Sequence, residues 1–262
     1  GLELFQPDKV RNAAFRERLA ACRPDLLAVV AYGRILPARV LALGTGGAVN
    51  VHFSLLPAYR GAAPVQWALA RGEVVTGVTT MHMNERMDEG DILLQEEVAI
   101  APDEHAPALE ERLARVGSAL LVETLRGLEA GRLIPRVQEH ARATLAPLLS
   151  RADGQITPEL SAAVIEGRVR GFDPWPGVWL LRAGKRLRLV DVRALEGTVP
   201  DRPAGSLIEL TREGLLMACG RGTRLLLLRV QPEGGKPLAV RDAVNGRHVR
   251  VGDRLEAAAA QV

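Results

Sequence analysis

AVNVHFSLLPAYRGAAP, residues 48–64, is the most informative part of this sequence about its fold. It opens with an apolar run that contains Asn50 and His52, two positions apart. Alternate side chains of a strand project to the same face, so these two point the same way at the end of a predicted strand over 48–52. Proline and glycine then break the chain before a helical pattern begins at Pro64. In an open α/β sheet, strand ends of this kind carry the ligand site.

The segments on either side alternate between helical and strand patterns. Helices are predicted over 11–22, 38–43, 64–71 and 107–130, and strands over 26–32, 48–52, 77–84 and 92–100. This order favours an α/β domain with a mostly parallel sheet whose last strands turn antiparallel.

A second region begins after the long predicted helix. Prolines and an Asp-Gly pair suggest a linker, and after a helix over 159–170 short β-rich runs alternate with Gly, Pro and Asp. That spacing is typical of a small β-barrel or sandwich. We therefore expect a domain over 1–131, a linker over 132–152 and a β-barrel domain over 153–262.

Charge is spread unevenly over these regions. Residues 1–150 hold 16 Lys and Arg against 18 Asp and Glu, whereas residues 151–262 hold 18 against 13. The second region is therefore the candidate surface for a polyanion, although an arginine-rich genome explains the same excess equally well. Two distant cysteines without a CxxC motif indicate neither a disulfide framework nor a zinc site, which fits a cytoplasmic protein. No apolar run is long enough to predict a membrane span.

Asn50 and His52 are the first candidates for chemistry, although a structural Asn-x-His pair is the more frequent reading of such a pattern. The five histidines show no metal-ligand spacing, and no GxSxG motif is present. What remains is acid–base chemistry with oxyanion stabilisation. Asp88 is the third candidate, because it lies in a glycine-containing loop and would stabilise an imidazolium beside it. Asp91 is its rival, and an Asp-x-Gly loop is as often only a turn.

NVHFSLLPAYRGAAP (50–64) resembles the Asn-x-His-x-Ser-Leu-Leu-Pro-x-x-Arg-Gly signature of the folate-dependent formyltransferases. MDEGDIL (87–93) is similar to the Asp-x-Gly motif of the same enzymes. AYGRILP, RGAAPVQWAL, TGVTTMHMN, LLSRADGQI and FDPWPGVW look most like the branch that acts on methionyl-tRNA, and the match runs through essentially the whole chain. The resemblance implies a Rossmann-like domain followed by a small OB-like β-barrel. It also implies that roughly sixty residues, or two βα units, precede Gly1 in the family's pattern.

The resemblance implies a reaction and a set of site residues. Formyl passes from 10-formyltetrahydrofolate to the α-amine of methionine on initiator tRNA, with no metal. Asn50, His52 and Asp88 are the catalytic residues by this analogy. The residues expected to bind the folate donor are Tyr32, Gly33, Ile35, Leu36, Ser54, Leu55, Leu56, Pro57, Met87, Gly90 and Asp91. The residues expected to contact tRNA are Arg60, Gly61 and Arg151, the last at a position where the family often has lysine.

Three alternatives remain open from the sequence. One is an N-formyltransferase acting on a sugar-nucleotide amine, which would share the Asn-His-Asp set. Another is a non-catalytic fragment that binds tRNA. A hydrolase that releases formate from the same donor is the third. For the favoured reading we expect a monomer in the cytoplasm, with initiator methionyl-tRNA and the folate donor as partners and no membrane contact.

Overall fold

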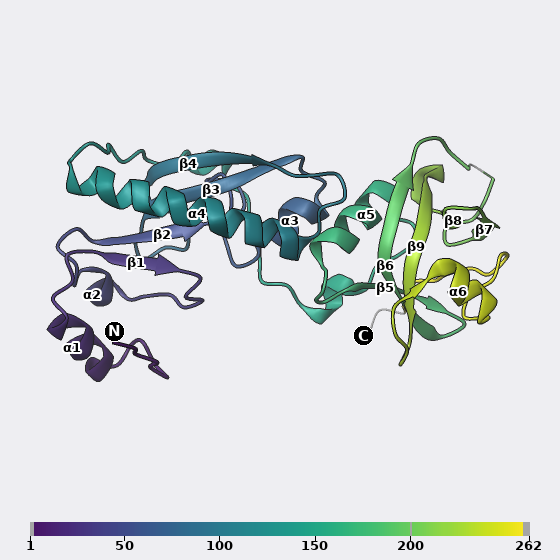
Figure 1. The fold of residues 1–262 in the computed structure, drawn as a ribbon, viewed down its shortest axis with the longest axis horizontal. Coiled ribbons are helices and arrows are strands. Elements are labelled where there is room, and N and C mark those ends of the chain that lie inside the picture. The colour runs from purple at the N-terminus through teal and green to yellow at the C-terminus, as the bar shows by residue number, and fades with distance from the viewer. Residues whose placement is uncertain (1–2, 200, 259–262) are drawn as a thin grey trace. The chain divides into compact units, whose positions relative to one another are not determined.

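The structure is a computed structural model that describes residues 3–199 and 201–258. The chain forms two compact units, and each unit takes up more than one stretch of sequence (Figure 1). The first unit is made of the residues up to 64, 75–99 and 110–148. The second unit is made of 65–74, 100–109 and 149 onward.

The first unit contains a four-stranded sheet with the order β1-β2-β3-β4. Its strands are β1 (Leu27–Val30), β2 (Ala48–His52), β3 (Val75–His82) and β4 (Ile92–Ala99). β1 and β2 pair in parallel, whereas β2–β3 and β3–β4 pair antiparallel. The last strands turn antiparallel, as predicted, and with one parallel pair the described part of the sheet is mixed. The loop 83–91 is too short for the crossover that a parallel β3–β4 pair would require.

One long helix covers this sheet. α4 (Ala106–Glu129) is held to β3 by a hydrogen bond of 2.7 Å between the hydroxyls of Thr80 and Thr124. The helix comes close to the sheet at Gly117, where a side chain would meet Val51 and Val78. The core of the first unit therefore lies between α4 and the strands β2 and β3, where side chains such as Val49, Val78 and Leu113 are fully buried.

Two shorter helices lie near β1. α1 (Ala13–Ala21) begins at Asn12, whose side-chain oxygen accepts a hydrogen bond from the Phe15 amide at 2.8 Å, as expected for an N-cap. α2 (Ala38–Leu41) contributes buried residues to a small apolar cluster with Val29 and Leu36. These helices agree in place with the helical patterns of the sequence, and their ends differ by a few residues.

Residues 132–148, which the sequence places in a linker, belong to the first unit. Arg136 exchanges two backbone hydrogen bonds of 2.8 Å with Ile92 at the start of β4. Further along, the backbone of Arg60 donates to Thr144 and accepts from Ala146. This irregular segment, which includes the short 3₁₀ turn η1 (His140–Arg142), therefore pairs with two loops of the α/β domain.

The second unit is built on an antiparallel sheet with the order β5-β6-β9-β8-β7. Its strands are β5 (Val178–Arg182), β6 (Lys185–Leu195), β7 (Leu207–Leu210), β8 (Leu215–Ala218), β9 (Arg224–Pro232) and the short β10 (Leu238–Ala239), which pairs with β9. α3 (Pro64–Ala70), α5 (Ala162–Gly171), α6 (Val240–Asn245) and the 3₁₀ turns η2 (Arg151–Gly154) and η3 (Gly220–Gly222) complete the helical elements.

The sheet of the second unit does not close into a regular barrel, in contrast to the prediction. The edge strands β5 and β7 do not pair with each other. Instead, the segment 252–256 forms backbone hydrogen bonds with both edges. Leu181 of β5 pairs with Glu256. The carbonyl of Leu207 in β7 accepts from the Gly252 amide, and the Leu207 amide donates to the Asp253 carbonyl. A single irregular segment thus covers the open edges that strands alone would leave. Trp67 on α3 and Phe172, the residue that follows α5, pack edge to face with ring centres 5.4 Å apart.

No helix in the described ranges combines the length and the apolar character that crossing a lipid bilayer requires.

The two cysteines differ in burial, and this difference can be tested. Burial raises the pKa of the Cys219 thiol to about 12, because the thiolate would lose its hydration, whereas Cys22 is exposed. At about pH 8 we expect a disulfide reagent such as DTNB to label one thiol in the native chain quickly. The second thiol should react only after denaturation, and Cys22→Ser should abolish the fast reaction. Two fast thiols in the native chain would contradict the burial of Cys219.

Candidate active site

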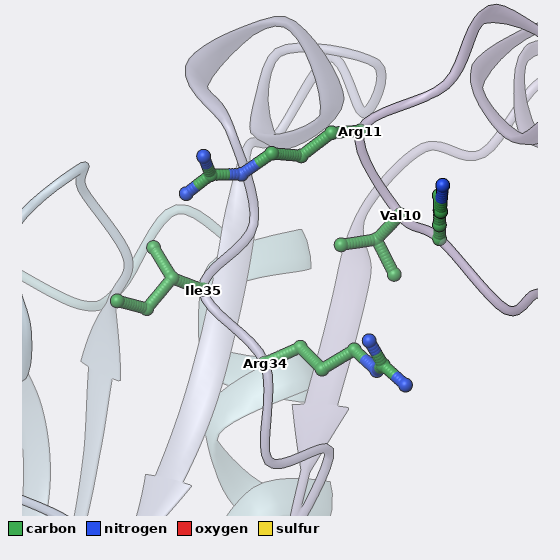
Figure 2. Close-up of a pocket in the computed structure, with 5 residues that line it drawn as sticks. Val10, Arg11, Arg34 and Ile35 are labelled. Carbon is green, nitrogen blue, oxygen red and sulfur yellow. The ribbon is translucent and has the colours of Figure 1, made fainter.

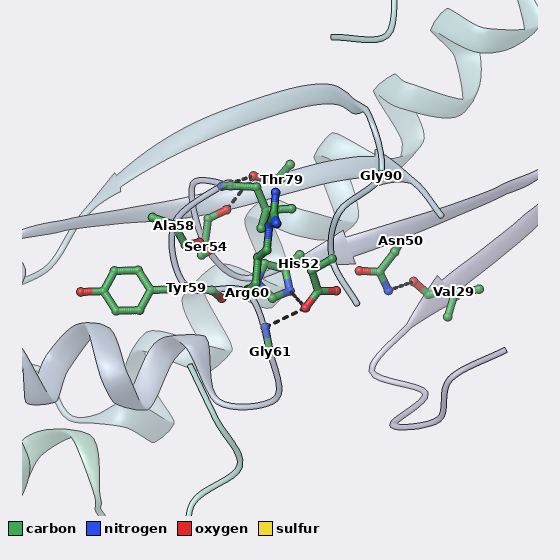
Figure 3. Close-up of polar contacts among 12 residues, drawn as sticks. Val29, Asn50, His52, Ser54, Ala58, Tyr59, Arg60, Gly61, Thr79 and Gly90 are labelled. Atoms are coloured by element: carbon green, nitrogen blue, oxygen red, sulfur yellow. Dashed lines mark hydrogen bonds and ion pairs between the residues drawn. The ribbon is translucent and has the colours of Figure 1, made fainter. Parts of the chain in front are cut away.

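Asn50 and His52 lie on β2, where the strand ends beside β1. The Asn50 amide nitrogen donates a hydrogen bond of 3.1 Å to the carbonyl oxygen of Val29, its partner in the parallel pairing (Figure 3). This contact uses one of the two amide N–H groups and fixes the orientation of the side chain. The second N–H group can therefore donate to an oxygen of a bound molecule.

His52 is held by two oxygen atoms from different loops. Its side chain is only 7% exposed, and Nε2 lies 2.9 Å from the carbonyl oxygen of Tyr59. A carbonyl only accepts, so Nε2 carries the proton of this hydrogen bond. Nδ1 is the nitrogen that remains, and it faces the Asp88 carboxylate oxygen Oδ2 at 3.7 Å.

Asp88 belongs to the loop between β3 and β4. Its carboxylate accepts a hydrogen bond of 2.8 Å from the Gly61 amide, and its side chain is 17% exposed. Asp88 adopts a left-handed backbone with φ of 56°, which is uncommon for a residue other than glycine. The rival residue, Asp91, pairs through its carbonyl with the His82 amide at the start of the β3–β4 ladder. The structure therefore brings Asp88, and not Asp91, next to His52.

The loop that follows His52 is tied to β3 and β4 by side-chain hydrogen bonds. Thr79 donates to the Ser54 carbonyl at 2.6 Å and accepts from the Leu56 amide at 3.2 Å. Gln95 on β4 donates to the Leu56 carbonyl at 2.9 Å. Ser54 itself is buried and donates to Ala58 within the loop. These contacts hold the loop 53–63 in one conformation against the sheet, and with it the Tyr59 carbonyl that accepts from His52.

The residues that were expected to bind the folate donor fall into two groups. Leu36, Ser54 and Leu56 are buried, and the two leucines pack in apolar clusters. The remaining residues are exposed or half-buried: Tyr32, Gly33, Ile35, Leu55, Pro57, Met87 and Asp91, with Gly90 buried in the backbone of the Asp88 loop. The first group is thus enclosed in the protein interior, and the side chains of the second group are accessible at least in part.

Ile35 also lines a hollow of about 390 Å³ between the segments 9–11 and 34–35 (Figure 2). Lys9, Arg11 and Arg34 line the same hollow, so it is positively charged. Arg11 and Arg34 extend from opposite sides of it in Figure 2. The hollow thus combines three cationic side chains with the apolar side chains of Val10 and Ile35.

Arg60 does not fit the prediction of a tRNA contact. Its side chain is 5% exposed, and its guanidinium group contacts Gln138, Glu89 and His140 inside the protein. A guanidinium group that is enclosed and paired in this way cannot reach a phosphate without unfolding its surroundings. Gly61, by contrast, offers its amide to Asp88, and Arg151 is exposed in the second unit.

Several residues of the site could not be found from the sequence. They are the Tyr59 carbonyl, Thr79, Gln95, Gln138 and Thr144. The Thr144 hydroxyl oxygen accepts a hydrogen bond of 2.8 Å from the Tyr59 amide. Gln138 and Thr144 lie in the irregular segment 132–148, which shows no periodicity that would mark them. Only the contacts of the folded chain reveal them.

Within the described residues, no three or more His, Cys, Asp and Glu side chains gather in a way that could hold a metal ion. The site therefore offers one amide, one imidazole and one carboxylate, with backbone amides nearby. Such a set can stabilise a negative oxygen and move a proton.

The α/β unit and this polar set are typical of enzymes that transfer a small group. Two family models that match the chain name the class of enzyme. Residues 2–125 match the model for "Formyl transferase", and residues 148–248 match "Formyl transferase, C-terminal domain". Solved structures of similar fold include HypX from Aquifex aeolicus in complex with tetrahydrofolic acid (TM-score 0.63, 18% identity, covering 90% of this chain and 42% of that one). Another is the N-formyltransferase from Helicobacter canadensis in complex with folinic acid and dTDP-3-aminofucose (TM-score 0.59, 16% identity, covering 74% and 70%).

Curated relatives narrow the class. The methionyl-tRNA formyltransferase of Acidobacterium capsulatum is 46% identical over 258 residues, which cover 98% of this chain and 82% of that protein. The corresponding protein of Desulfotalea psychrophila is 47% identical over 240 residues, covering 92% and 74%. The chain therefore belongs to the methionyl-tRNA formyltransferase family. The family resemblance of the sequence and the predicted order of an α/β domain and a β domain are confirmed.

Gly90 allows a close approach that holds the Asp88 loop, and its substitution can be tested. A Cβ atom on Gly90 would lie 1.6 Å from the carbonyl oxygen of His82. We expect Gly90→Ala to lower the free energy of unfolding by about 2 kcal/mol or more, since backbone must move to relieve the clash.

Gly131→Ala is the matched control, measured like Gly90→Ala by urea denaturation. Gly131 has a left-handed φ of 63° but open space around it, so only the conformational cost of about 1 kcal/mol applies. Equal losses in the two variants would show that the approach of Gly90 to His82 is not needed.

Proposed function

We propose that this chain transfers the formyl group of 10-formyltetrahydrofolate to the α-amine of methionine esterified to initiator tRNA. The observation that carries the proposal is the arrangement of Asn50, His52 and Asp88 at the end of β2, in a chain nearly half identical to proteins named for this reaction. The reduced folate in two structures of similar fold supports the choice of donor.

The polar set matches the charges that the reaction creates. When bound, the donor supplies a formyl carbon on N10, and attack by the substrate amine places negative charge on the formyl oxygen. The uncommitted N–H group of Asn50 donates to that oxygen, and its contact with Val29 keeps it in place. Asn50 thus favours the transition state without any change of its own charge.

His52 and Asp88 manage the proton. The attacking amine loses a proton as its bond to the formyl carbon forms, and N10 gains one as its bond to that carbon breaks. The Asp88 carboxylate accepts, and Nδ1 of His52 faces it, so together they carry the proton between the two nitrogens. The separation of 3.7 Å is longer than a hydrogen bond but keeps the two groups in direct contact, so that one proton-accepting group lies against the other.

A direct assay tests the proposal. Radiolabelled formyl transfer from 10-formyltetrahydrofolate should appear on methionyl initiator tRNA. It should be absent with a sugar-nucleotide amine as acceptor, and free formate should not accumulate without an acceptor. Transfer to the sugar amine alone, or formate release alone, would replace the proposal by one of these two activities.

Removing the charge of Asp88 tests its role without changing its shape. In Asp88→Asn the side-chain oxygen can still accept from Gly61, but it no longer takes up a proton. We expect kcat to fall by about a hundredfold or more, measured as initial rates of formyl transfer. Glu85→Gln, an exposed residue of the same loop, is the control and should keep kcat within about twofold. An Asp88→Asn variant as active as the control would remove Asp88 from the mechanism.

For the tRNA partner, the candidates are the Lys and Arg residues of the second unit and the aromatic side chains beside them. On the β5–β6 hairpin the Arg186 guanidinium lies over the Trp179 ring at 4.3 Å, and Trp175 is 50% exposed. The Arg188 guanidinium group pairs with Asp173 at 3.1 Å and also donates to the Pro174 carbonyl, so it holds the loop that contains these two residues. Arg186 is therefore the better candidate for a phosphate contact.

Salt dependence tests this assignment. We expect the affinity for tRNA to fall with salt, because Lys and Arg displace counterions from phosphates. Arg186→Gln should weaken binding and reduce the slope of log Kd against log salt by about one, measured by filter binding. Arg115→Gln on α4, where Arg115 is exposed and pairs with Glu111, is the control and should leave the slope unchanged. An unchanged slope in both variants would exclude Arg186 from the interface.

A further inference from the structure

We propose that Gln138 is a positioning residue: its buried amide holds the loop that carries Asp88, so that the carboxylate stays against His52. The inference rests on the proposed function for its kinetic consequence, but its structural core can be tested without any catalytic assay. Gln138 lies in the irregular segment 132–148, which is distant in sequence from the motifs that contain His52 and Asp88.

The side chain of Gln138 forms hydrogen bonds with the backbone of the Asp88 loop. The side-chain nitrogen donates to the carbonyl oxygen of Asp88 at 2.9 Å and to that of Gly90 at 2.7 Å. The two carbonyls flank Glu89, so the amide bridges the turn on which Asp88 adopts its left-handed φ. A residue in this conformation persists only when its surroundings hold it, and the Gln138 amide supplies that constraint.

The other end of the Gln138 amide is held by Arg60. Nε and Nη2 of Arg60 donate to the Gln138 oxygen at 3.1 and 2.7 Å. Carbonyl oxygens only accept and a guanidinium group only donates, so the partners define which end of the amide is nitrogen and which is oxygen. Gln138 is 3% exposed, and this arrangement satisfies both ends of its amide.

Arg60 connects the Gln138 amide to the groups that contact His52 and Asp88. It lies between Tyr59, whose carbonyl accepts from His52, and Gly61, whose amide donates to the Asp88 carboxylate. Its guanidinium group also faces Glu89 at 3.4 Å, on the same loop as Asp88. Gln138 and Arg60 therefore set the distance between the two loops that meet at the site.

This geometry predicts a rate effect without a binding effect. If the amide is lost, the Asp88 loop can shift, and a shift of about 1 Å in a catalytic group can cost about a hundredfold in rate. Donor and tRNA would still meet the same surfaces. We expect Gln138→Glu to lower kcat by about tenfold to a hundredfold, with KM values within about threefold of the original.

Gln138→Glu is the informative substitution because it preserves shape and the pairing with Arg60. A carboxylate accepts from the guanidinium group but cannot donate to the carbonyls of Asp88 and Gly90. Gln231→Glu is the matched control, since Gln231 also donates from its amide to a backbone carbonyl, that of Gly235 at 2.8 Å, in the second unit. Gln138→Met removes the same donors without adding charge, and it decides the question if the glutamate variant does not fold.

The first readout is hydrogen exchange of the Gly61 amide, followed by NMR or by peptide mass. This amide is protected by the Asp88 carboxylate, so it reports directly on the position of Asp88. We expect exchange at Gly61 to speed up at least tenfold in both Gln138 variants, and to remain unchanged in Gln231→Glu. Unchanged exchange in the Gln138 variants would overturn the proposal, whatever the activity.

The second readout separates positioning from general destabilisation. In the Asp88→Asn background, Gln138→Glu should lower kcat by less than twofold, because there is no longer a carboxylate to position. Additive losses would show that Gln138 acts by another route and would overturn the proposal. If the unaltered chain transfers no formyl, the proposed function fails, while the exchange at Gly61 still decides whether Gln138 holds Asp88.

Discussion

The hydrogen bond between the Gly61 amide and the Asp88 carboxylate is the contact on which the site depends. It joins a loop that follows β2 to a loop that precedes β4, and Nδ1 of His52 faces the same carboxylate oxygen. Gly61 has a φ of 126°, and a side chain there would lie 2.4 Å from the Ala146 carbonyl. The residue must therefore be glycine for the amide to reach Asp88 while the chain passes so close to the segment 132–148.

Burial of the Arg60 guanidinium sets the second constraint. A charged group loses its hydration on burial and must recover that free energy from hydrogen bonds and opposite charge. Gln138, His140 and Glu89 provide these contacts, and each belongs to a segment that also shapes the site. The arginine thus holds these loops together, and its cost in hydration is balanced only when the loop 83–91 and the segment 132–148 are both in place.

Under the proposed function, the two units have different tasks. The first unit holds the amide, imidazole and carboxylate on a sheet whose loops are braced by Thr79 and Gln95. The second unit carries the excess of Lys and Arg over Asp and Glu, together with the exposed Trp175 and the half-buried Trp179 of β5. Chemistry needs rigid groups, whereas contact with a polyanion needs charge over a wide surface, so the two tasks suit different kinds of fold.

Local patterns of the sequence determined most elements and the identity of the central residues. Apolar periodicity located β2 and α4 to within a residue, and the spacing of Asn50 and His52 placed them on one face of the strand. The long mixed motif from Asn50 to Pro64 was specific enough to indicate the family, which the relatives confirm. These features depend on neighbours in sequence, where side-chain spacing and chain stiffness act directly.

Tertiary structure alone decided how distant segments meet. Apart from the family resemblance, nothing in the sequence shows that Asp88 rather than Asp91 faces His52. Nothing in it shows that Arg60 turns inward or that Gln138 reaches two carbonyls of another loop. The mixed sheet and the open edges of the second sheet likewise follow from which strands pair. Such contacts depend on burial and on the need of every enclosed polar group for a partner, and these are satisfied only when the whole chain has folded.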